Sequence, residues 1–267
     1  MSFVSARPLD PSPEHDLSAA DVPMASAFPD RMGGAELRQV AKHHVMVVVF
    51  ALHEWRGWSV EALEIIDTRE RQRVERQRQP RHRVDLALAY ALHRMVLARA
   101  LDIPPARVPL ARDPRGRPTL DAMEAQTSLS HADGYVAVAL SQSGAIGVDV
   151  EPTSRAQVMP EVADRICHGD EFARIAACRG ADRGAALLDL WVRKEAFLKA
   201  AGVGLAREMD TFSLPVDRAV ALHPGQAGRV EIERLDLGPD VACAVARPPG
   251  VGCIAGWLRP TRQEEAR

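Results

Sequence analysis

The stretch Gly144-Ala-Ile-Gly-Val-Asp-Val-Glu151 is the most informative part of this sequence. Apolar residues occupy every second position from Ile146 onward, which is the period of two typical of a β-strand. Side chains two positions apart on a strand project from the same face, so Asp149 and Glu151 point the same way. Two carboxylates that face one way need a cation between them, and Mg²⁺ prefers carboxylate, water and phosphate oxygens. The stretch therefore predicts a strand that ends in a metal site.

A helix is predicted farther along the chain, over residues 185–201, because apolar residues recur there at helical spacing until Gly202. Glu195 and Lys199 lie four positions apart and share a face, so the helix can supply a third carboxylate and an ammonium group. The plainer alternative is a surface pair worth about 0.2–0.5 kcal/mol. Lys194 points about 100° away around the helix, so partner docking and simple solvation are equally open for it.

Together the two stretches resemble the phosphopantetheinyl transferase superfamily, of the Sfp type. Gly-Val-Asp-Val-Glu is followed by Trp-x-x-Lys-Glu-Ala-x-x-Lys-Ala-x-Gly-x-Gly-Leu, matched here from Trp191 to Leu205. The resemblance covers residues 40–260 and implies transfer of phosphopantetheine from coenzyme A to a serine of an apo carrier protein, with release of adenosine 3′,5′-bisphosphate. It implies Mg²⁺ as cofactor, held by Asp149, Glu151 and Glu195. The catalytic residues that it implies are Glu195, Lys199 and His131.

Two short elements extend the resemblance to the coenzyme. Ser130 and His131 match a pair that contacts the pyrophosphate of coenzyme A, although Ser128 and Ala132 stand where the family commonly has Asn and Ser. The turn of residues 116–118 is similar to the family's Gly-Lys-Pro turn, with Arg in place of Lys. A Ser-His pair also invites a hydrolase interpretation, but adjacent residues cannot easily form a nucleophile–base hydrogen bond.

The segment of residues 69–83 is a dense basic tract, and most of its arginines are explained by a solvated helix face. In the family, basic residues of this region hold the 3′-phosphate and adenine of coenzyme A. Arg83 lies just ahead of a helix predicted over residues 84–101, whose N-terminus would favour a phosphate, and Arg71 is a second choice. The coenzyme contacts implied by the resemblance are therefore Arg71, Arg83, Gly116, Arg117, Pro118, Ser130, His131 and Lys199.

Composition sets limits on other functions. Of the 267 residues, 46% are hydrophobic and 26% charged, with a net charge of −2, so neither nucleic acid nor membrane binding is favoured. The basic tract also lacks the interleaved aromatic residues of nucleic-acid binders. The four cysteines show no metal-ligand spacing, no apolar run is long enough to span a bilayer, and the start lacks the pattern of a signal peptide. We expect a cytoplasmic monomer that meets an acidic carrier protein transiently.

The order of predicted elements favours an α+β fold of two similar halves. Each half runs from helices to antiparallel strands, and residues 135–140 are echoed by residues 241–246. This agrees with the architecture that the resemblance implies, two pseudo-symmetric halves with the active site at their junction. We expect the following divisions: a flexible extension (1–38), a coenzyme-binding half (39–143), a half with the metal site and catalytic helix (144–260) and a tail (261–267).

Within this frame we expect strands at residues 42–52, 127–131, 135–141, 211–215, 229–235, 241–246 and 254–258, and further helices at 59–78 and 159–179. Two other functions remain open: a catalytically inactive coenzyme A or nucleotide-binding module, and a Mg²⁺-dependent phosphohydrolase. The sequence does not identify the carrier, which could serve fatty-acid, polyketide or nonribosomal peptide synthesis, or the selectivity for acylated coenzyme A.

Overall fold

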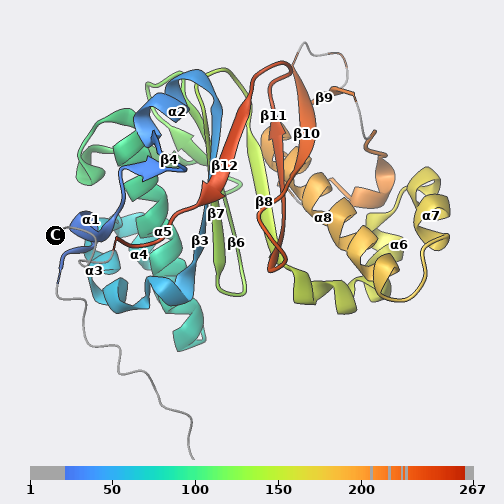
Figure 1. Cartoon of the computed structure of the whole chain (residues 1–267), viewed down its shortest axis with the longest axis horizontal. Coiled ribbons are helices and arrows are strands. Elements are labelled where there is room, and N and C mark those ends of the chain that lie inside the picture. Colours follow the sequence, from blue (N-terminus) through green and yellow to red (C-terminus); the bar gives the residue numbers. More distant parts are fainter. Residues whose placement is uncertain (1–21, 205–206, 216–217, 224, 226–227, 262–267) are drawn as a thin grey trace, which may run out of the picture.

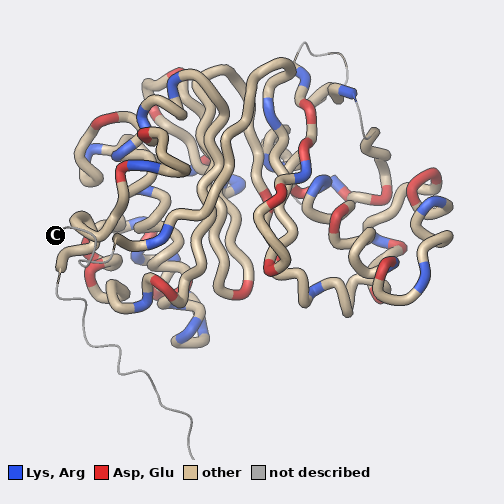
Figure 2. Tube along the Cα trace, in the orientation of Figure 1, with Lys and Arg blue, Asp and Glu red and all other residues tan. Residues whose placement is uncertain are grey.

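A computed structural model describes residues 22–204, 207–215, 218–223, 225 and 228–261. The chain forms two halves that lie side by side, each with helices packed on a four-stranded sheet (Figure 1). The predicted α+β architecture is confirmed. Lys and Arg are interspersed with Asp and Glu along the described trace of both halves (Figure 2).

The first half contains most of the chain up to residue 141. Its helices are α1 (Met24–Ala27), α2 (Leu37–His43), α3 (Ser59–Ile65), α4 (Thr68–Glu75) and α5 (Pro80–Leu101), with single 3₁₀ turns at Leu52–Glu54, Arg56–Trp58 and Pro105–Arg107. Its strands are β1 (Arg31–Met32), β2 (Ala35–Glu36), β3 (Val45–Ala51), β4 (Leu110–Arg112), β5 (Pro118–Leu120), β6 (Gln126–Ala132) and β7 (Tyr135–Ser141). The main sheet has the order β12-β3-β7-β6, while β1–β2 and β4–β5 form separate two-stranded ribbons.

The second half is built around one long helix. Its helices are α6 (Ala163–Ile166), α7 (Gly169–Ala176) and α8 (Ala181–Ala201), with 3₁₀ turns η4 (Thr153–Gln157), η5 (Met159–Val162) and η7 (Met209–Thr211). Its strands are β8 (Gly147–Pro152), β9 (Val220–Ala221), β10 (Arg229–Leu235) and β11 (Val241–Arg247), followed by β12 (Cys253–Trp257). The sheet has the order β8-β11-β10-β9, and its described pairings are antiparallel.

Three apolar clusters give the molecule its layers. One lies between the helices of the first half and their sheet, and another lies between α8 and the sheet of the second half. The third joins β3 and β7 to β8 and β11, so it lies between the two sheets. Val148 and Val150 belong to this third cluster, which confirms that β8 turns its apolar positions one way and its acidic positions the other.

β12 corrects the predicted domain boundary. We predicted that residues 144–260 form one half, but β12 pairs in parallel with β3 of the first half, with Cys253 opposite Val45. A crossing strand of this kind leaves no local signal, because the pairing partner of a strand is set by long-range packing. The chain therefore returns to its first half after completing the second.

The predicted flexible extension is wrong for its described part. Met24 and Phe28 are 0% and 2% exposed and belong to the core of the first half. Met32 and Leu37 join the same core. Residues 1–21 lie outside the described residues, so the extension prediction is not tested there.

Several predicted element bounds also change. The helix expected at residues 59–78 is two helices, because Asp67 begins α4 with a capping box that includes Glu70. Pro80 begins α5 instead of preceding it, which a proline at the first helical position readily does. Residues 159–179 form η5, α6 and α7 in place of one helix, and no strand is described within residues 211–215.

No helix among the described residues is long and apolar enough to cross a membrane.

Candidate active site

The edge strands of the two sheets, β6 and β8, meet at the centre of the molecule. The hydroxyl of Ser128 accepts a hydrogen bond from the backbone N–H of Val148 at 3.1 Å. The hydroxyl of Ser130 donates one to Asp149 Oδ1 at 2.7 Å. Ser130 was predicted to contact coenzyme A, whereas here it holds an acidic residue of the other half. The two serines thus join the halves at the predicted metal strand.

Helix α8 lies against β8 because Gly147 has no side chain. A Cβ atom at Gly147 would lie 2.0 Å from the backbone oxygen of Ala196, which no side chain could tolerate. This close approach brings Lys199 to β8, where its ammonium donates to Asp149 Oδ1 at 2.7 Å and to the oxygen of Val148 at 3.0 Å. Lys199 therefore pairs with Asp149, and the alternative of a plain surface pair with Glu195 is excluded.

Glu151 lies beside an arginine of the segment that follows it. Arg155 donates to Glu151 Oε1 at 2.6 Å, and its guanidinium lies 4.9 Å from the ring centre of Trp191 on α8. Burial raises the pKa of Glu151, the nearby charge of Asp149 raises it further, and Arg155 opposes both. A cation already balances this carboxylate in part.

The pKa of Glu195 on α8 is also raised by its surroundings. Burial, followed by the charge of Asp149, raises the pKa of Glu195 to about 7, while Lys199 opposes and Glu151 adds to the rise. The predicted trio of carboxylates therefore shares one electrostatic environment. A carboxyl group that titrates near neutral pH can take up or release a proton under physiological conditions.

Two observations bear on whether this site could hold a metal ion. The described residues contain no group of three or more His, Cys, Asp or Glu side chains already arranged to hold one. However, Asp149 Oδ2 and Glu151 Oε2 are buried without a hydrogen-bond partner among those residues. Buried carboxylate oxygens without donors suit a hard cation. The chemistry of the donors thus fits Mg²⁺, and the assignment to Asp149, Glu151 and Glu195 stays a prediction.

A groove of about 740 Å³ opens beside the acidic cluster. His131 and Glu151 line it together with Tyr90 and a set of basic side chains from α4 and α5. The basic set comprises Arg73, Arg76, Arg81 and His82, and Arg155 joins it from η4. The protein wall desolvates His131 and lowers its pKa, and the charge of Lys199 acts in the same direction. A groove whose lining is mainly basic, with a few carboxylates, can hold a polyanion.

The two arginines chosen from the sequence do not line this groove. Arg71 donates to the backbone oxygen of Leu63 at 2.6 Å, and Arg83 donates to that of Gln77 at 2.8 Å. Arg83 lies within α5, because the helix begins at Pro80. The arginines that do line it were overlooked in favour of Arg83, whose choice depended on a helix that begins too late.

The turn of residues 116–118 lies between the halves and is not part of the groove lining. Arg117 donates to Gln126 Oε1 at 3.3 Å, and its guanidinium lies so near Gly202 that a Cβ there would be 2.7 Å from Nη1. Arg115 donates to the oxygen of Gly202 at 3.0 Å. Both arginines therefore lie at the C-terminal end of α8, where positive charge is favourable. Pro118 is buried at the start of β5.

Lys194 is entirely buried, so neither alternative left open for it is right. Its ammonium lies 2.5 Å from Glu171 Oε2 and donates to three backbone oxygens. No local pattern indicates this burial, because a lysine on a helix is ordinarily expected at the surface.

Two family models match the chain on either side of this junction. One is described as 4′-phosphopantetheinyl transferase, N-terminal, and matches residues 53–143; the other is the 4′-phosphopantetheinyl transferase superfamily, which matches residues 145–246. The chain belongs to the 4′-phosphopantetheinyl transferase superfamily. The family resemblance predicted from the two motifs is confirmed.

Curated members of this superfamily are similar to parts of the chain. A putative 4′-phosphopantetheinyl transferase of Synechocystis is 29% identical over 53% of this chain and 59% of its own length. The 4′-phosphopantetheinyl transferase Sfp of Bacillus subtilis is 30% identical over 56% of this chain and 62% of its own length. HetI of Nostoc, a 4′-phosphopantetheinyl transferase, is 25% identical over 62% of this chain and 71% of its own length. The chain thus matches about three fifths of the length of the first two relatives.

Proposed function

We propose that the protein transfers the phosphopantetheine group of coenzyme A to a serine hydroxyl of an apo carrier protein. The observation that carries this proposal is the groove of about 740 Å³, whose lining holds more basic than acidic side chains and includes Glu151. A coenzyme with a 3′-phosphate and a pyrophosphate is a ligand that such a groove would hold by charge. Family membership supplies the reaction class, and the relatives are named for it.

Each half would contribute a different part of the substrate site. Arg73, Arg76 and Arg81 of the first half would bind phosphate oxygens, and His131 would donate to the pyrophosphate. Lys199, already charged and held at Asp149, would add a cation at the end of α8. Mg²⁺ held by the three carboxylates would neutralise pyrophosphate charge when bound.

Transfer requires one bond to form and one to break. The carrier serine oxygen attacks the phosphorus nearest pantetheine, and the bond from that phosphorus to the oxygen of the adenosine-side phosphate breaks. The pair of electrons leaves with adenosine 3′,5′-bisphosphate. Glu195 would accept the serine proton, a role that its raised pKa of about 7 would suit near neutral pH. Positioning and charge neutralisation supply most of the rate enhancement in such transfers.

The test is transfer to a panel of apo carrier proteins from fatty-acid, polyketide and nonribosomal peptide synthesis, incubated with coenzyme A and MgCl₂. The readout is the mass gain of phosphopantetheine on the carrier serine, with an alanine variant of that serine as a blank. Release of phosphopantetheine without a carrier would indicate a phosphohydrolase, and coenzyme binding without either reaction would indicate an inactive module.

Asp149→Asn is the matching variant, because Asn keeps the volume of a side chain that is 3% exposed but loses its charge. We expect transfer to fall by about 100-fold or more, the size seen when a catalytic electrostatic contact is lost. Asp182→Asn, at an exposed acid in the first turn of α8, serves as control and should transfer like wild type. Transfer by Asp149→Asn within a few-fold of wild type would remove the metal assignment.

A further inference from the structure

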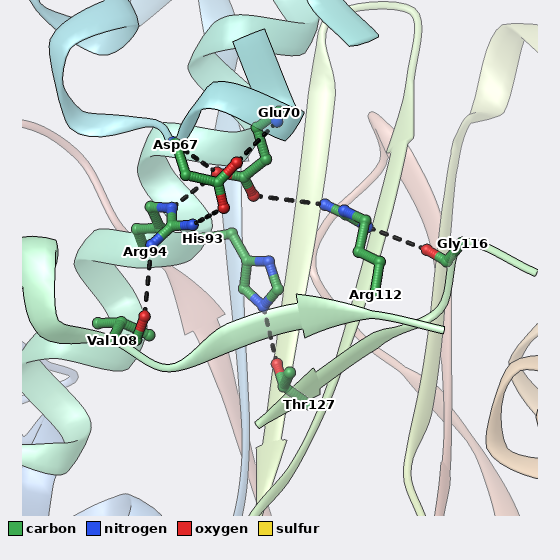
Figure 3. Close-up of polar contacts among 8 residues, drawn as sticks. All are labelled: Asp67, Glu70, His93, Arg94, Val108, Arg112, Gly116 and Thr127. Carbon is green, nitrogen blue, oxygen red and sulfur yellow. Dashed lines mark hydrogen bonds and ion pairs between the residues drawn. The ribbon is translucent and has the colours of Figure 1, made fainter. Parts of the chain in front are cut away.

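A buried polar network joins α4, α5 and β4 beside the groove (Figure 3). Glu70 is 3% exposed, and its Oε2 accepts from Arg94 Nε at 2.7 Å. Glu70 also closes the capping box of α4 with Asp67. These contacts fix Glu70, and they leave its other oxygen, Oε1, 3.7 Å from Arg112 Nη2. The network therefore holds the start of α4, the helix that carries Arg73 of the groove.

Arg112 is the member of this network that contacts both a groove residue, Tyr90, and the turn at Gly116. Its side chain is 14% exposed, and burial lowers its pKa. Its guanidinium lies 4.5 Å from the ring centre of Tyr90, which lines the groove, and Nη1 donates to the oxygen of Gly116 at 3.1 Å. Nε and Nη2 of Arg112 and Oε1 of Glu70 have no hydrogen-bond partner among the described residues.

Arg112 is not expected to stabilise the fold. A buried charge with unsatisfied donors costs free energy that an apolar side chain of similar size would avoid. An arginine at this position therefore calls for a role other than folding. Among the described residues Arg112 donates to Gly116, so the role is to be sought at the turn that contains Gly116.

The turn of residues 113–117 is built to present Gly116. Asp113 Oδ1 accepts from the backbone N–H groups of Arg115 and Arg117, at 2.9 Å each. Gly116 has φ +88°, a conformation that glycine adopts without strain. A Cβ atom at Gly116 would lie 3.4 Å from Arg73 Nη1, an ordinary van der Waals distance, so the guanidinium of Arg73 packs beside the turn at Gly116. Arg73 is a groove-lining arginine.

We propose that Arg112 is a positioning residue for coenzyme binding: it holds the 113–117 turn against α4 so that Gly116 seats Arg73 toward the coenzyme phosphates. Arg112 donates to the oxygen of Gly116, and the guanidinium of Arg73 lies at van der Waals distance from the position that a Gly116 side chain would take. The proposal deepens the proposed function and rests on it, because it takes coenzyme A as the occupant of the groove.

The first experiment measures the dissociation constant of coenzyme A by calorimetry for wild type, Arg112→Leu and Arg112→Lys, with the melting temperature of each. We expect Arg112→Leu to weaken binding about tenfold. Arg112→Lys keeps a cation over Tyr90 and a donor for Gly116, so it should stay within about threefold of wild type. Arg107→Leu, at an exposed arginine of the segment before β4, is the control and should bind like wild type.

The second experiment separates positioning from a general loosening of the fold. Arg112→Leu is combined with Arg73→Leu, and the coenzyme dissociation constants form a double-mutant cycle. If Arg112 acts through Arg73, its replacement should weaken binding less than twofold in the Arg73→Leu background, because coupled residues are not additive. Full additivity, or wild-type coenzyme binding by Arg112→Leu, would overturn the proposal.

Asp113→Ala, in the same turn, tests the proposal independently if Arg112→Leu does not fold. Asp113→Ala removes the acceptor that shapes the turn and should weaken coenzyme binding about as much, again with less effect when Arg73 is leucine. Wild type that binds coenzyme A without transferring it would refute the proposed function and leave this inference standing. Wild type that transfers, with Arg112→Leu and Asp113→Ala binding normally, would refute the inference alone; no coenzyme binding by wild type would refute both.

Discussion

Replacing Lys194 with methionine should destabilise the protein far more than its place in an active-site motif would suggest. The side chain is 0% exposed, and its ammonium donates to the oxygens of Ile166, Met209 and Phe212 at 2.7–2.8 Å. The fourth acceptor, Glu171 Oε2, lies at 2.5 Å. Methionine fills a similar volume, so the change removes the charge and the donors while leaving little cavity.

The expected loss of stability follows from the buried charge of Glu171, which Lys194→Met leaves without its ion-pair partner. Breaking a buried ion pair by removing one partner costs about 3–5 kcal/mol, because the other charge stays buried without compensation. Glu171 would keep two backbone donors, His168 N at 3.0 Å and Leu214 N at 2.8 Å, which places the expected loss toward the lower part of that range. The backbone oxygens that lose their donor add to it. We therefore expect a loss of about 3–5 kcal/mol in the free energy of unfolding.

Urea denaturation followed by far-ultraviolet circular dichroism measures this loss. Lys42→Met, at an exposed lysine of α2, is the matched control and should stay within about 0.5 kcal/mol of wild type. Replacing Glu171 by leucine in the Lys194→Met background removes the stranded charge and should recover part of the loss. A loss below about 1 kcal/mol for Lys194→Met would refute the argument, because the ammonium would then be contributing little to folding.

Three further changes have expected outcomes. Lys199→Met should lower transfer by about 100-fold and also lower the melting temperature, since it leaves a buried carboxylate without its ion pair; transfer near the wild-type rate would contradict the role given to the ammonium. Glu195→Gln should remove a pH dependence of folding. Because the pKa of Glu195 is raised from 4.5 to about 7 in the folded protein, the protonated carboxyl group favours folding at low pH. This contribution to the free energy of unfolding, up to about 3 kcal/mol, is lost as pH rises from 4.5 through 7. The unfolding free energies of both proteins, measured from pH 5 to 8 without metal, should lie close together at low pH, where Glu195 is protonated and neutral like glutamine. They should separate as pH rises through 7, with the wild type losing stability, and parallel curves would show that Glu195 titrates normally. Removing residues 1–28 should lower the melting temperature, because Met24 is a core residue, and a truncation of residues 1–21, which keeps Met24, is the comparison; equal melting temperatures would show that this core contact contributes little.

Much of the site could be predicted because its signals are local. The alternation around Asp149 and the helical spacing of Glu195 and Lys199 depend on neighbours in sequence, and both elements form where the patterns indicate. Gly147, which the alternation treats as a spacer, turned out to set the distance between β8 and α8. Close approach of two elements has no periodic signature, so the sequence alone could not assign this role.

The predictions that differ from the structure concern residues whose surroundings depend on distant parts of the chain or on the exact start of a helix. Lys194 is buried and β12 pairs with β3 because of contacts made by elements far apart in the chain. Arg83 was favoured because Pro80 was read as the end of a helix, although a proline also fits the first helical turn. Arg73 was missed because the basic tract offers many arginines, and only the packing of α4 decides which of them face the groove.

The meeting of two sheet edges explains how the acidic cluster can be buried and still lie beside the groove proposed to bind the coenzyme. The first half supplies the hydroxyl of Ser130 and the basic wall of the groove, and the second supplies Asp149, Glu151 and Lys199. Their relative placement depends on the apolar layer between the sheets, in which Val148 lies directly beside the acids. A small shift of one sheet against the other would separate the phosphate-binding wall from the carboxylates while leaving the two outer cores intact. Substitutions in this middle layer should therefore impair transfer before they unfold either half, which places control of the chemistry in a layer that touches no substrate.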